Sequence, residues 1–358
     1  MMYQVFAPGR VELLGNHTDY NAGVVMSAAL DLGTTVTGEA SAGSRIRLRS
    51  AGFPEVIVDA SEPLHPSGGW SDYPVGVVAK FIEAGYEVGG FEAEFSTNLP
   101  VGAGLSSSAS IEVATAVLLC RMFDWEISPM DLARLCKKAE NEFAGVNCGI
   151  LDQVSCIFGK RQHAIFLDCR KESVQRVPFP EGVELLIVHS GVKHALTGGE
   201  YNERRDQCFE AARTLGVPAL RDASTADLSH AGLSDVVRRR AAHITGENER
   251  VFAGLSALEL GDLETFGRLL TASHMSSMEN FENSTPELDS LVRIATSQPG
   301  VLGARLTGGG FGGAIIALVM AENIETAKVE ILSKYLTDME IDTDAYHCRM
   351  GDGAIPDA

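Results

Sequence analysis

A glycine- and serine-rich run from Pro100 to Ser110 carries residues that could hold an anion. Its glycines let the backbone approach a ligand closely and turn N–H groups outward. Behind its serines, Val113, Ala116 and Val117 follow at helical spacing, so we expect a helix to begin within the run. A helix N-terminus offers unpaired N–H groups and the positive end of a dipole, which predicts an anion site, with phosphate the usual anion. For this run alone, a glycine turn with a serine cap is the alternative.

Hydrogen-bonding side chains are also dense between Ala7 and Gly23. They are Arg10, Glu12, Asn16, His17, Asp19, Tyr20 and Asn21. Planar donors and carboxylates packed so closely suit a ligand covered with hydroxyl groups. A polar loop that follows a strand is the alternative interpretation.

Two further carboxylates could bind a metal ion or accept a proton. Glu140 is expected at the end of a helix that starts at Pro129, and Asp152 follows a glycine-containing turn. A glutamate and a serine hydroxyl are hard oxygen ligands that suit Mg²⁺, which also bridges phosphates. Asp152 could accept the proton of a hydroxyl group. A solvated glutamate at a helix end and a capping aspartate are the alternatives.

A second glycine-rich run extends from Arg305 to Ala314 and contains a G-x-G-x-x-G match at Gly308, Gly310 and Gly313. A dinucleotide-binding fingerprint must open a helix, whereas the residues that follow here have the pattern of a strand. We therefore interpret the run as a flexible or close-approach loop beside a ligand. The sequence contains neither G-x-x-x-x-G-K-[ST] nor the protein-kinase motifs, so any use of ATP does without a Walker lysine.

The elements that must position these residues have clear signals. Helices are predicted after the capping signals at Ser128–Asp131 and Ser284–Glu287, and from Glu200 to Leu215 with a stop at Gly216. Strands are predicted at 183–190 and 314–320. We place a domain boundary near residue 182.

Composition narrows the possible class of protein. A chain of 358 residues is too long for one ordinary core, which predicts two domains. The net charge of −19 argues against nucleic acids and anionic membranes as partners. No apolar run reaches the ~18 residues that span a bilayer, and we expect no secretion signal. The seven cysteines are scattered, as in a reduced cytoplasmic protein.

In their order and spacing, these motifs resemble those of the GHMP small-molecule kinases, and most closely the galactokinase branch. Gly9–Tyr20 resembles the family's first motif, Pro100–Ser110 its phosphate loop and Leu306–Gly313 its third motif. Further segments similar to galactokinases are 146–153, 190–208 and 273–289. The resemblance covers nearly the whole chain.

This resemblance implies an α+β fold with two domains and an active site in the cleft between them. Residues 1–182 would form an α/β domain with a mixed sheet, and residues 183–358 a ferredoxin-like α+β domain. The implied reaction is ATP-dependent phosphorylation of the anomeric hydroxyl of α-D-galactose, with Mg²⁺. The implied partners are the sugar and MgATP. We expect no nucleic acid and no membrane as partners, and a monomer in the cytoplasm.

The resemblance also implies roles for individual residues. Asp152 would be the catalytic base or orient the hydroxyl, and Arg10 would lie beside the transferred phosphoryl group and hold Asp152 ionised. The implied sugar-binding residues are Asn16, His17, Asp19, Gly149 and Tyr201. Those for the nucleotide are Trp70, which would stack on adenine, and Gly102, Ala103, Gly104, Leu105, Ser106, Ser107 and Ser108 around the phosphates. Glu140 and a serine would hold Mg²⁺, Ser108 being the first choice and Ser107 the next.

One departure from the family pattern stands out. The family's usual Asn is Glu12 here, and its usual Glu, which contacts the C6 hydroxyl in galactokinases, is Asn16. One interpretation is a compensated exchange within a shared polar network. The other is an altered preference at C6, which makes galacturonic acid or another galactose-like sugar the alternative substrate. A non-catalytic regulator that binds galactose and ATP is the alternative of another class, and Ser108, Asp152 and Glu140 argue for an enzyme.

Overall fold

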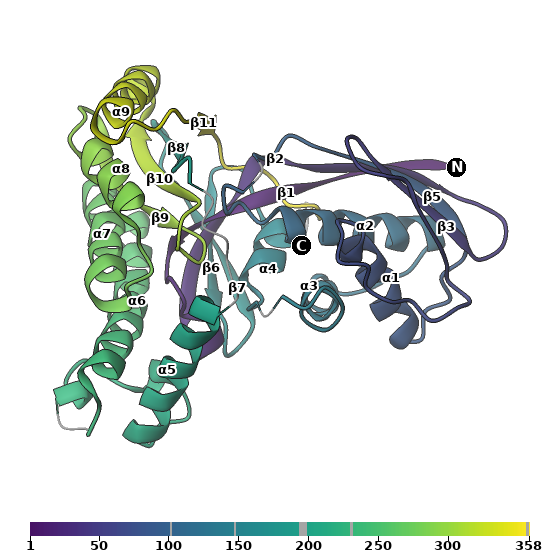
Figure 1. Ribbon diagram of the computed structural model, residues 1–358, viewed down its shortest axis with the longest axis horizontal. Coiled ribbons are helices and arrows are strands. Elements are labelled where there is room, and N and C mark those ends of the chain that lie inside the picture. Colours follow the sequence, from purple (N-terminus) through teal and green to yellow (C-terminus); the bar gives the residue numbers. More distant parts are fainter. Residues whose placement is uncertain (101, 147, 193–198, 230–231, 356–357) are drawn as a thin grey trace.

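The computed structural model describes residues 1–100, 102–146, 148–192, 199–229, 232–355 and 358. Within these ranges the strands form two sheets, one from each part of the chain (Figure 1). The first part supplies β1 to β7 and helices α1 to α4, and the second supplies β8 to β11 and helices α5 to α9. No helix in these ranges is long and apolar enough to cross a membrane.

The first sheet is mixed. Its strands run in the order β4-β3-β5-β2-β6-β7, with β1 paired to β2 beside this path. β3 and β5 pair in parallel and the other neighbours are antiparallel. The strands are β1 Met2–Leu14, β2 Val24–Ala40, β3 Arg45–Ser50, β4 Val56–Asp59, β5 Phe91–Thr97, β6 His163–Asp168 and β7 Ser173–Pro178. Phe91, Ala93 and Phe95 of β5 point into the core because alternate residues of a strand share a face.

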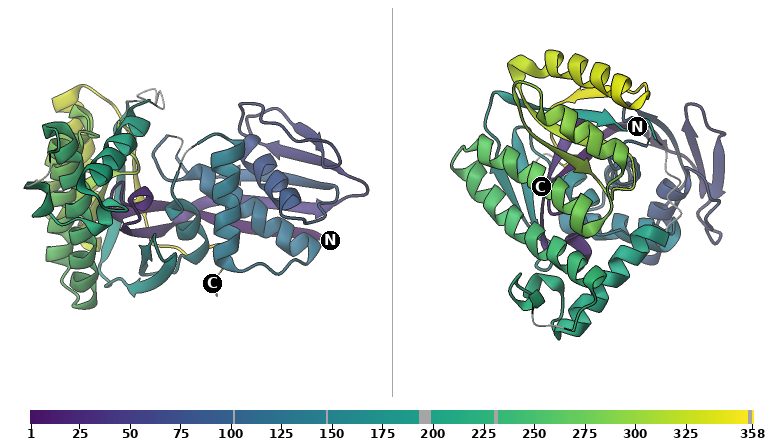
Figure 2. Two further views of the ribbon diagram at one scale, coloured as in Figure 1. Left: turned by 90° about the horizontal axis from the view of Figure 1, so that it is seen from below. Right: turned by 60° about the vertical axis from the view of Figure 1, so that its left-hand side comes forward.

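Helices of the first part pack against this sheet through a large apolar cluster (Figures 1 and 2). They are α1 Asp72–Glu83, α2 Ser107–Phe123, α3 Pro129–Lys138 and α4 Leu151–Phe158. The capping signal predicted for α3 is confirmed, since Ser128 Oγ accepts the N–H of Asp131 and Pro129 takes the first helical position. A π-helical turn, Ala139–Phe143, continues α3 and carries Glu140.

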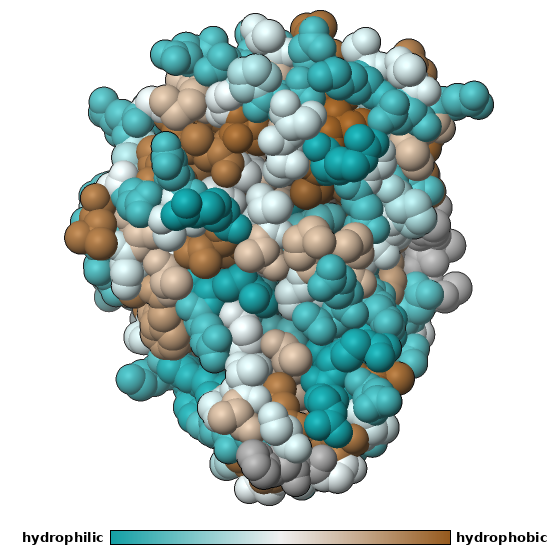
Figure 3. Space-filling model, turned by 90° about the vertical axis from the view of Figure 1, so that its left-hand side faces the viewer, coloured by the Kyte–Doolittle hydropathy of each residue, from teal (hydrophilic) through white to brown (hydrophobic). Residues whose placement is uncertain are grey.

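The second sheet is antiparallel, in the order β11-β8-β10-β9. Its strands are β8 Val183–His189, β9 Val301–Thr307, β10 Ala314–Met320 and β11 Ala345–Cys348. The helices of this part are α5 Gly199–Leu215, α6 Asp235–Glu259, α7 Leu263–Ser276, α8 Pro286–Thr296 and α9 Ile324–Met339. Side chains on the face where these helices meet the solvent are mostly hydrophilic, with apolar ones between them (Figure 3).

The predicted strands at 183–190 and 314–320 and the predicted helix from Glu200 agree with β8, β10 and α5. The cap of α8 lies one residue later than predicted, because Thr285 Oγ1, not Ser284, accepts the N–H of Leu288. Ser284 Oγ instead donates to Asp289 Oδ1, at 2.5 Å.

An apolar cluster joins the two parts of the chain. It combines residues of β1 and β2, such as Leu13 and Met26, with residues of β8 and α7, such as Ile187 and Phe266. A second tie is the segment 349–355, which leaves β11 and runs back along the first part (Figure 2). Its N–H groups at Gly351, Gly353 and Ala354 donate to carbonyls of Ala29, Gly159 and Cys156. The domain boundary near residue 182 falls between β7 and β8 and stays a prediction, since these ties span it.

Candidate active site

The loop predicted to bind phosphate ends at the N-terminus of α2, as its glycines and serines led us to expect. Gly102 and Gly104 adopt positive φ angles of 78° and 68°, which side chains disfavour, and Ser106 does so at 56°. α2 begins at Ser107 and has no acidic residue in its first turn. The loop therefore presents a helix N-terminus and its dipole to an anion without a neighbouring carboxylate from that turn.

The glycine-rich loop after β9 lies directly against this phosphate loop. A side chain at Gly104 would contact the carbonyl of Thr307, and one at Gly308 would contact the carbonyl of Gly104. β10 follows the loop as a strand, in agreement with our rejection of a dinucleotide-binding fingerprint. Residues from the two parts of the chain therefore meet backbone to backbone at this point.

Arg10 and Asp152 form a two-pronged ion pair beside the phosphate loop. Arg10 Nε donates to Asp152 Oδ1 at 2.7 Å, and its Nη2 donates to Oδ2 at 2.8 Å. Burial alone would lower the pKa of Arg10, but the Asp152 carboxylate outweighs it and raises that pKa above its ordinary value. The remaining guanidinium nitrogen, Nη1, donates to the carbonyl of Gly104 at 2.7 Å, so the arginine is held against the loop.

Ser106 adds a third contact to Asp152, since its hydroxyl donates to Oδ2 at 2.6 Å. The side chain of Asp152 remains 20% exposed, whereas that of Arg10 is 8% exposed. A bidentate, charge-assisted pair holds a carboxylate in one orientation. The arrangement can hold the Asp152 carboxylate aimed at a hydroxyl group while leaving part of it accessible.

Glu140 lies close to the start of α2, buried to 3% exposure. It is within hydrogen-bonding reach of the Ser108 side chain. Burial and the nearby Asp152 carboxylate raise the pKa of Glu140 above its ordinary value, which a cation at the same place would reverse. A buried carboxylate beside a hydroxyl at a phosphate loop is a donor set that fits Mg²⁺.

The polar loop after β1 places Asp19 and Gly149 in contact. A side chain on Gly149 would collide with Asp19 Oδ2, so only glycine leaves room for this carboxylate. Burial, and next the charge of Glu12, raise the pKa of Asp19 to about 6. Asp19 is therefore mainly ionised at pH 7 and can accept hydrogen bonds from hydroxyl groups.

His17 lies among aromatic rings in this loop. Its ring centroid is 5.1 Å from that of Tyr201, and its Nδ1 and Nε2 lie 2.8 Å from Tyr20 Oη and 3.0 Å from the Gly309 carbonyl. Burial lowers its pKa to about 4, so the ring is neutral at pH 7. His17 has a positive φ of 61°, a conformation that costs energy and recurs at functional sites.

Glu12 and Asn16, the exchanged pair, belong to one buried network. Asn16 Nδ2 donates to Glu12 Oε1 at 2.9 Å and to the Gly308 carbonyl at 2.8 Å, while its Oδ1 accepts from Asn283 at 2.9 Å. Arg305, which is fully buried, pairs with the same Glu12 oxygen at 2.8 Å. Glu12 therefore places a carboxylate next to position 16, where the family usually has one. Both hydrogens of the Asn16 side-chain amide take part in hydrogen bonds.

The structure brings nearly all predicted residues into this region, with Trp70 as the exception. Its contacts are with Phe53 and Phe95, at ring distances of 5.9 and 5.8 Å, and its indole N–H is buried without a partner among the described residues. Its stacking on adenine therefore stays a prediction.

Sequence reasoning missed a polar stripe on α6 that holds the loop after β1. Glu247 Oε2 accepts the N–H groups of Gly15 and Asn16 at 2.8 and 2.9 Å, and Asn248 Oδ1 accepts that of Val24 at 3.0 Å. His243 Nε2 lies 3.2 Å from the carbonyl of Asn16. In the sequence these residues stand out only as polar side chains at helical spacing. This spacing does not identify the groups that they bind.

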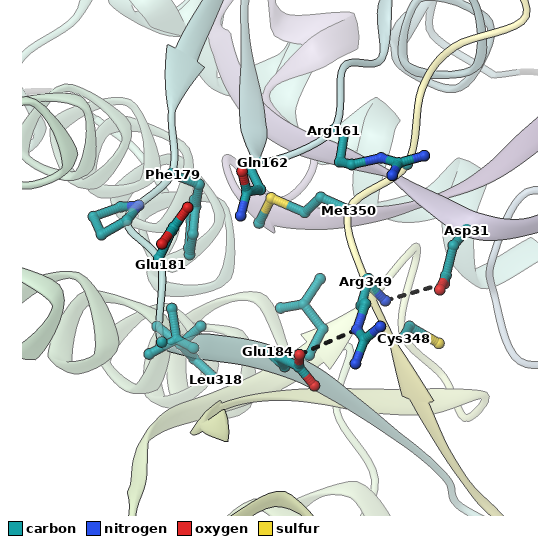
Figure 4. A pocket seen from close by; sticks show the side chains of 15 residues that line it. Asp31, Arg161, Gln162, Phe179, Glu181, Glu184, Leu318, Cys348, Arg349 and Met350 are labelled. Carbon is teal, nitrogen blue, oxygen red and sulfur yellow. Dashed lines mark hydrogen bonds and ion pairs between the residues drawn. The ribbon is translucent and has the colours of Figure 1, made fainter. Parts of the chain in front are cut away.

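The cavity drawn in Figure 4 is a different place. It has a volume of about 470 Å³ at the junction of the two parts, and none of the predicted site residues lines it. Two contacts join residues that line it: Arg349 Nε donates to Glu184 at 3.1 Å, and the backbone N–H of Arg349 donates to Asp31 at 3.0 Å.

Three family models match the chain. They are the GHMP kinases N terminal domain at residues 72–160, the galactokinase galactose-binding signature at residues 3–39 and the GHMP kinases C terminal domain at residues 255–336. The galactokinase of Thermotoga maritima is 40% identical over 351 residues, which cover 98% of this chain and 99% of the relative. That of Pyrococcus furiosus is 40% identical over 349 residues, 98% of each chain.

Solved structures of this family have the same fold. The galactokinase of Lactococcus lactis, crystallised with galactose, superimposes with a TM-score of 0.94 at 34% identity, covering 98% of this chain and 94% of that one. Mevalonate kinase of Methanococcus jannaschii has a TM-score of 0.71 at 22% identity, with 98% of both chains covered, and shares the fold. The predicted α+β fold with two domains of this family type is confirmed.

Proposed function

The chain belongs to the galactokinases of the GHMP kinase family, as its motifs predicted, and from this premise we propose that it phosphorylates the anomeric hydroxyl of α-D-galactose with ATP. The observation that carries the proposal is the Arg10–Asp152–Ser106 cluster beside the phosphate loop. Phosphoryl transfer depends on positioning and on neutralising charge more than on a strong base. This cluster supplies both.

In the proposed mechanism, Asp152 orients the attacking hydroxyl and takes its proton late. Arg10 holds Asp152 in this orientation through two hydrogen bonds. The same guanidinium offers positive charge where the transferred phosphoryl group would pass. N–H groups of the loop from Gly102 to Ser108 would hold the remaining phosphates.

The metal in this proposal is Mg²⁺, held by Glu140 and Ser108. When bound, Mg²⁺ neutralises phosphate charge and fixes the geometry of the nucleotide. The close approach of the two side chains supports Ser108, rather than Ser107, as the partner of Glu140.

Galactose is favoured over galacturonate by the hydrogen bonds of the exchanged pair. Glu12 Oε1 lies 2.9 Å from Asn16 Nδ2, so a carboxylate is still present where the family usually has one. A sugar carboxylate at C6 would find no free amide hydrogen on Asn16, because Glu12 and the Gly308 carbonyl already accept both of them. The network thus supports the compensated exchange, and Asp19, His17, Gly149 and Tyr201 would contact the rest of the sugar.

The exchange can be tested by reversing it in two steps. Asn16→Glu alone places two carboxylates together and should lower kcat/KM for galactose at least roughly tenfold. The double variant, Glu12→Asn with Asn16→Glu, restores the usual family arrangement and should recover most of that loss. The measurement is kcat/KM with galactose and with galacturonate for all three proteins. Faster turnover of galacturonate by the parent would overturn galactose as the substrate, and failure of the double variant to recover would overturn the compensated exchange.

We also propose that the enzyme is a cytoplasmic monomer. All seven cysteines are free, as in a reducing compartment, and a net charge of −19 disfavours self-association at neutral pH. Light scattering after size-exclusion chromatography tests the monomer, and a dimer mass would contradict it.

A further inference from the structure

Two fully buried polar side chains, Glu112 and Gln153, lie behind Glu140. Gln153 Nε2 donates to Glu140 Oε2 at 2.6 Å and to Glu112 Oε2 at 3.1 Å. Both Gln153 and Glu112 are 0% exposed. One amide group therefore connects two carboxyl groups, Glu112 on α2 and Glu140 on the π-helical turn, from its own position on α4.

Stability alone does not account for this arrangement. Glu112 Oε1 and Gln153 Oε1 are buried without a hydrogen-bond partner among the described residues. A buried polar atom without a partner costs roughly 1–3 kcal/mol, and a buried carboxyl group beside another carboxylate adds to that. Unfavourable polar groups of this kind are retained mainly at functional sites.

The neighbours of these residues are the groups assigned to the reaction. Ser108 precedes Glu112 by four residues on α2, so the two side chains lie on the same face, one turn apart. Gln153 directly follows Asp152 in the first turn of α4. The same turn therefore carries the carboxylate that orients the hydroxyl and the amide that holds Glu140.

We propose that Gln153, itself held by Glu112, is a positioning residue that fixes the orientation of the Glu140 carboxylate for a divalent cation. The inference rests on the proposed function. Gln153 and the Cys148 thiol both donate to Oε2 of Glu140, at 2.6 and 3.1 Å, which leaves Oε1 for Ser108 and the cation. Glu112 contributes by accepting the second amide hydrogen, so that the amide cannot turn away.

The test measures binding of Mn²⁺, as a probe for Mg²⁺, to the protein with ADP by electron paramagnetic resonance. Gln153→Met keeps the size of the side chain and removes the donor, so Mn²⁺ affinity should fall at least tenfold. Glu112→Leu removes the acceptor and should weaken Mn²⁺ binding severalfold, whereas Glu112→Gln keeps an acceptor oxygen and should stay within twofold of the parent. Glu140→Gln is the positive control.

Gln298→Met is the matched control, since Gln298 is also buried but lies on the second part of the chain, bonded to the Ile294 carbonyl and to Lys334. It should lower thermal stability without changing Mn²⁺ affinity. If Gln153→Met does not fold, Gln153→Asn, whose amide is too short to reach both carboxyl groups, replaces it with the same expectation.

Three results would overturn the inference or its premise, and they are distinguishable. Unchanged Mn²⁺ affinity in the folded Gln153 variant would reduce Gln153 to a structural residue. Equal loss in Glu112→Gln and Glu112→Leu would show that the acceptor oxygen is not what matters. A parent that binds ADP but no Mn²⁺ would instead contradict the metal proposed for the reaction.

Discussion

The two ends of the candidate site are built in different ways. At the phosphate end, Arg10, Ser106 and Asp152 all come from the first part of the chain and hold one another by charge-assisted hydrogen bonds. At the sugar end, the loop after β1 is held by the second part, through α6, β9 and the glycine-rich loop. Asn16 there is fully buried. The difference teaches that the first part of the chain positions the reacting groups by itself, whereas sugar recognition depends on how the two parts meet.

The largest expected effect is at the phosphate end. Asp152→Asn keeps the shape of the side chain but cannot take a proton and loses the ion pair with Arg10. We expect kcat to fall at least roughly a hundredfold, while ATP binding stays nearly unchanged. Steady-state kinetics and calorimetric titration with ATP measure the two. Near-normal turnover would remove Asp152 from the mechanism. It would also contradict the view that the first part of the chain alone positions the reacting groups.

At the sugar end, Gly149→Ala tests the contact with Asp19. The added methyl group would collide with Asp19 Oδ2 and push the carboxylate away. Since overpacking costs about 1–3 kcal/mol, KM for galactose should rise roughly tenfold or more. Gly199→Ala is the control, because no atom of the described residues lies within 4 Å of a side chain there. An unchanged KM would mean that Asp19 does not contact the sugar.

The dependence of the sugar end on the second part is tested at Glu247. Although burial acts to raise its pKa, Arg250 lowers it to about 2, so Glu247 is ionised where it accepts the N–H groups of Gly15 and Asn16. Glu247→Gln weakens these bonds and should raise KM for galactose roughly tenfold with little change in KM for ATP. Glu249→Gln, on the exposed side of the same helix, should change neither. Equal rises in KM for galactose and for ATP would contradict the difference between the two ends.

The last expected effect is on folding stability and not on a kinetic constant, and it is a pH dependence that comes from the same helix. Burial lowers the pKa of His243 to about 3, below its ordinary 6.5, so the unfolded chain binds a proton there that the folded protein does not. Its contribution to stability is complete above pH 6.5 and is lost as the pH falls towards 3, at up to about 1.4 kcal/mol per pH unit. His243→Gln should flatten the free energy of unfolding against pH in that window. The exposed His65→Gln is the control, and an unchanged slope would contradict a neutral His243.

Sequence reasoning went furthest where one local rule decides the structure. The cap at Ser128, the strand Ala314–Met320 and the helix start at Ser107 each depend on neighbouring residues, and each was predictable. The fold and the family followed from motifs whose order is preserved along the chain.

Contacts between distant residues were not predictable in this way. The pairing of Glu12 with Arg305 and the hold of Glu247 on Gly15 join segments far apart in the sequence. Spacing within a single element carries no information about which distant element packs against it. For the same reason the exchange of Glu12 and Asn16 had two interpretations from the sequence, and the shared network around Arg305 favours one of them.

The return of residues 349–355 to the first part has a consequence for how the protein is made. This segment supplies partners to the carbonyls of Ala29, Cys156 and Gly159, yet a ribosome synthesises it after every strand of both sheets. The first part therefore emerges with its edge at α4 unfinished, and its final hydrogen bonds form only when the second part is already present. Proteins whose domains fold as independent units can complete the first before the second appears. Here the hydrogen bonds from residues 351–354 to the first part can form only after the second part has been synthesised.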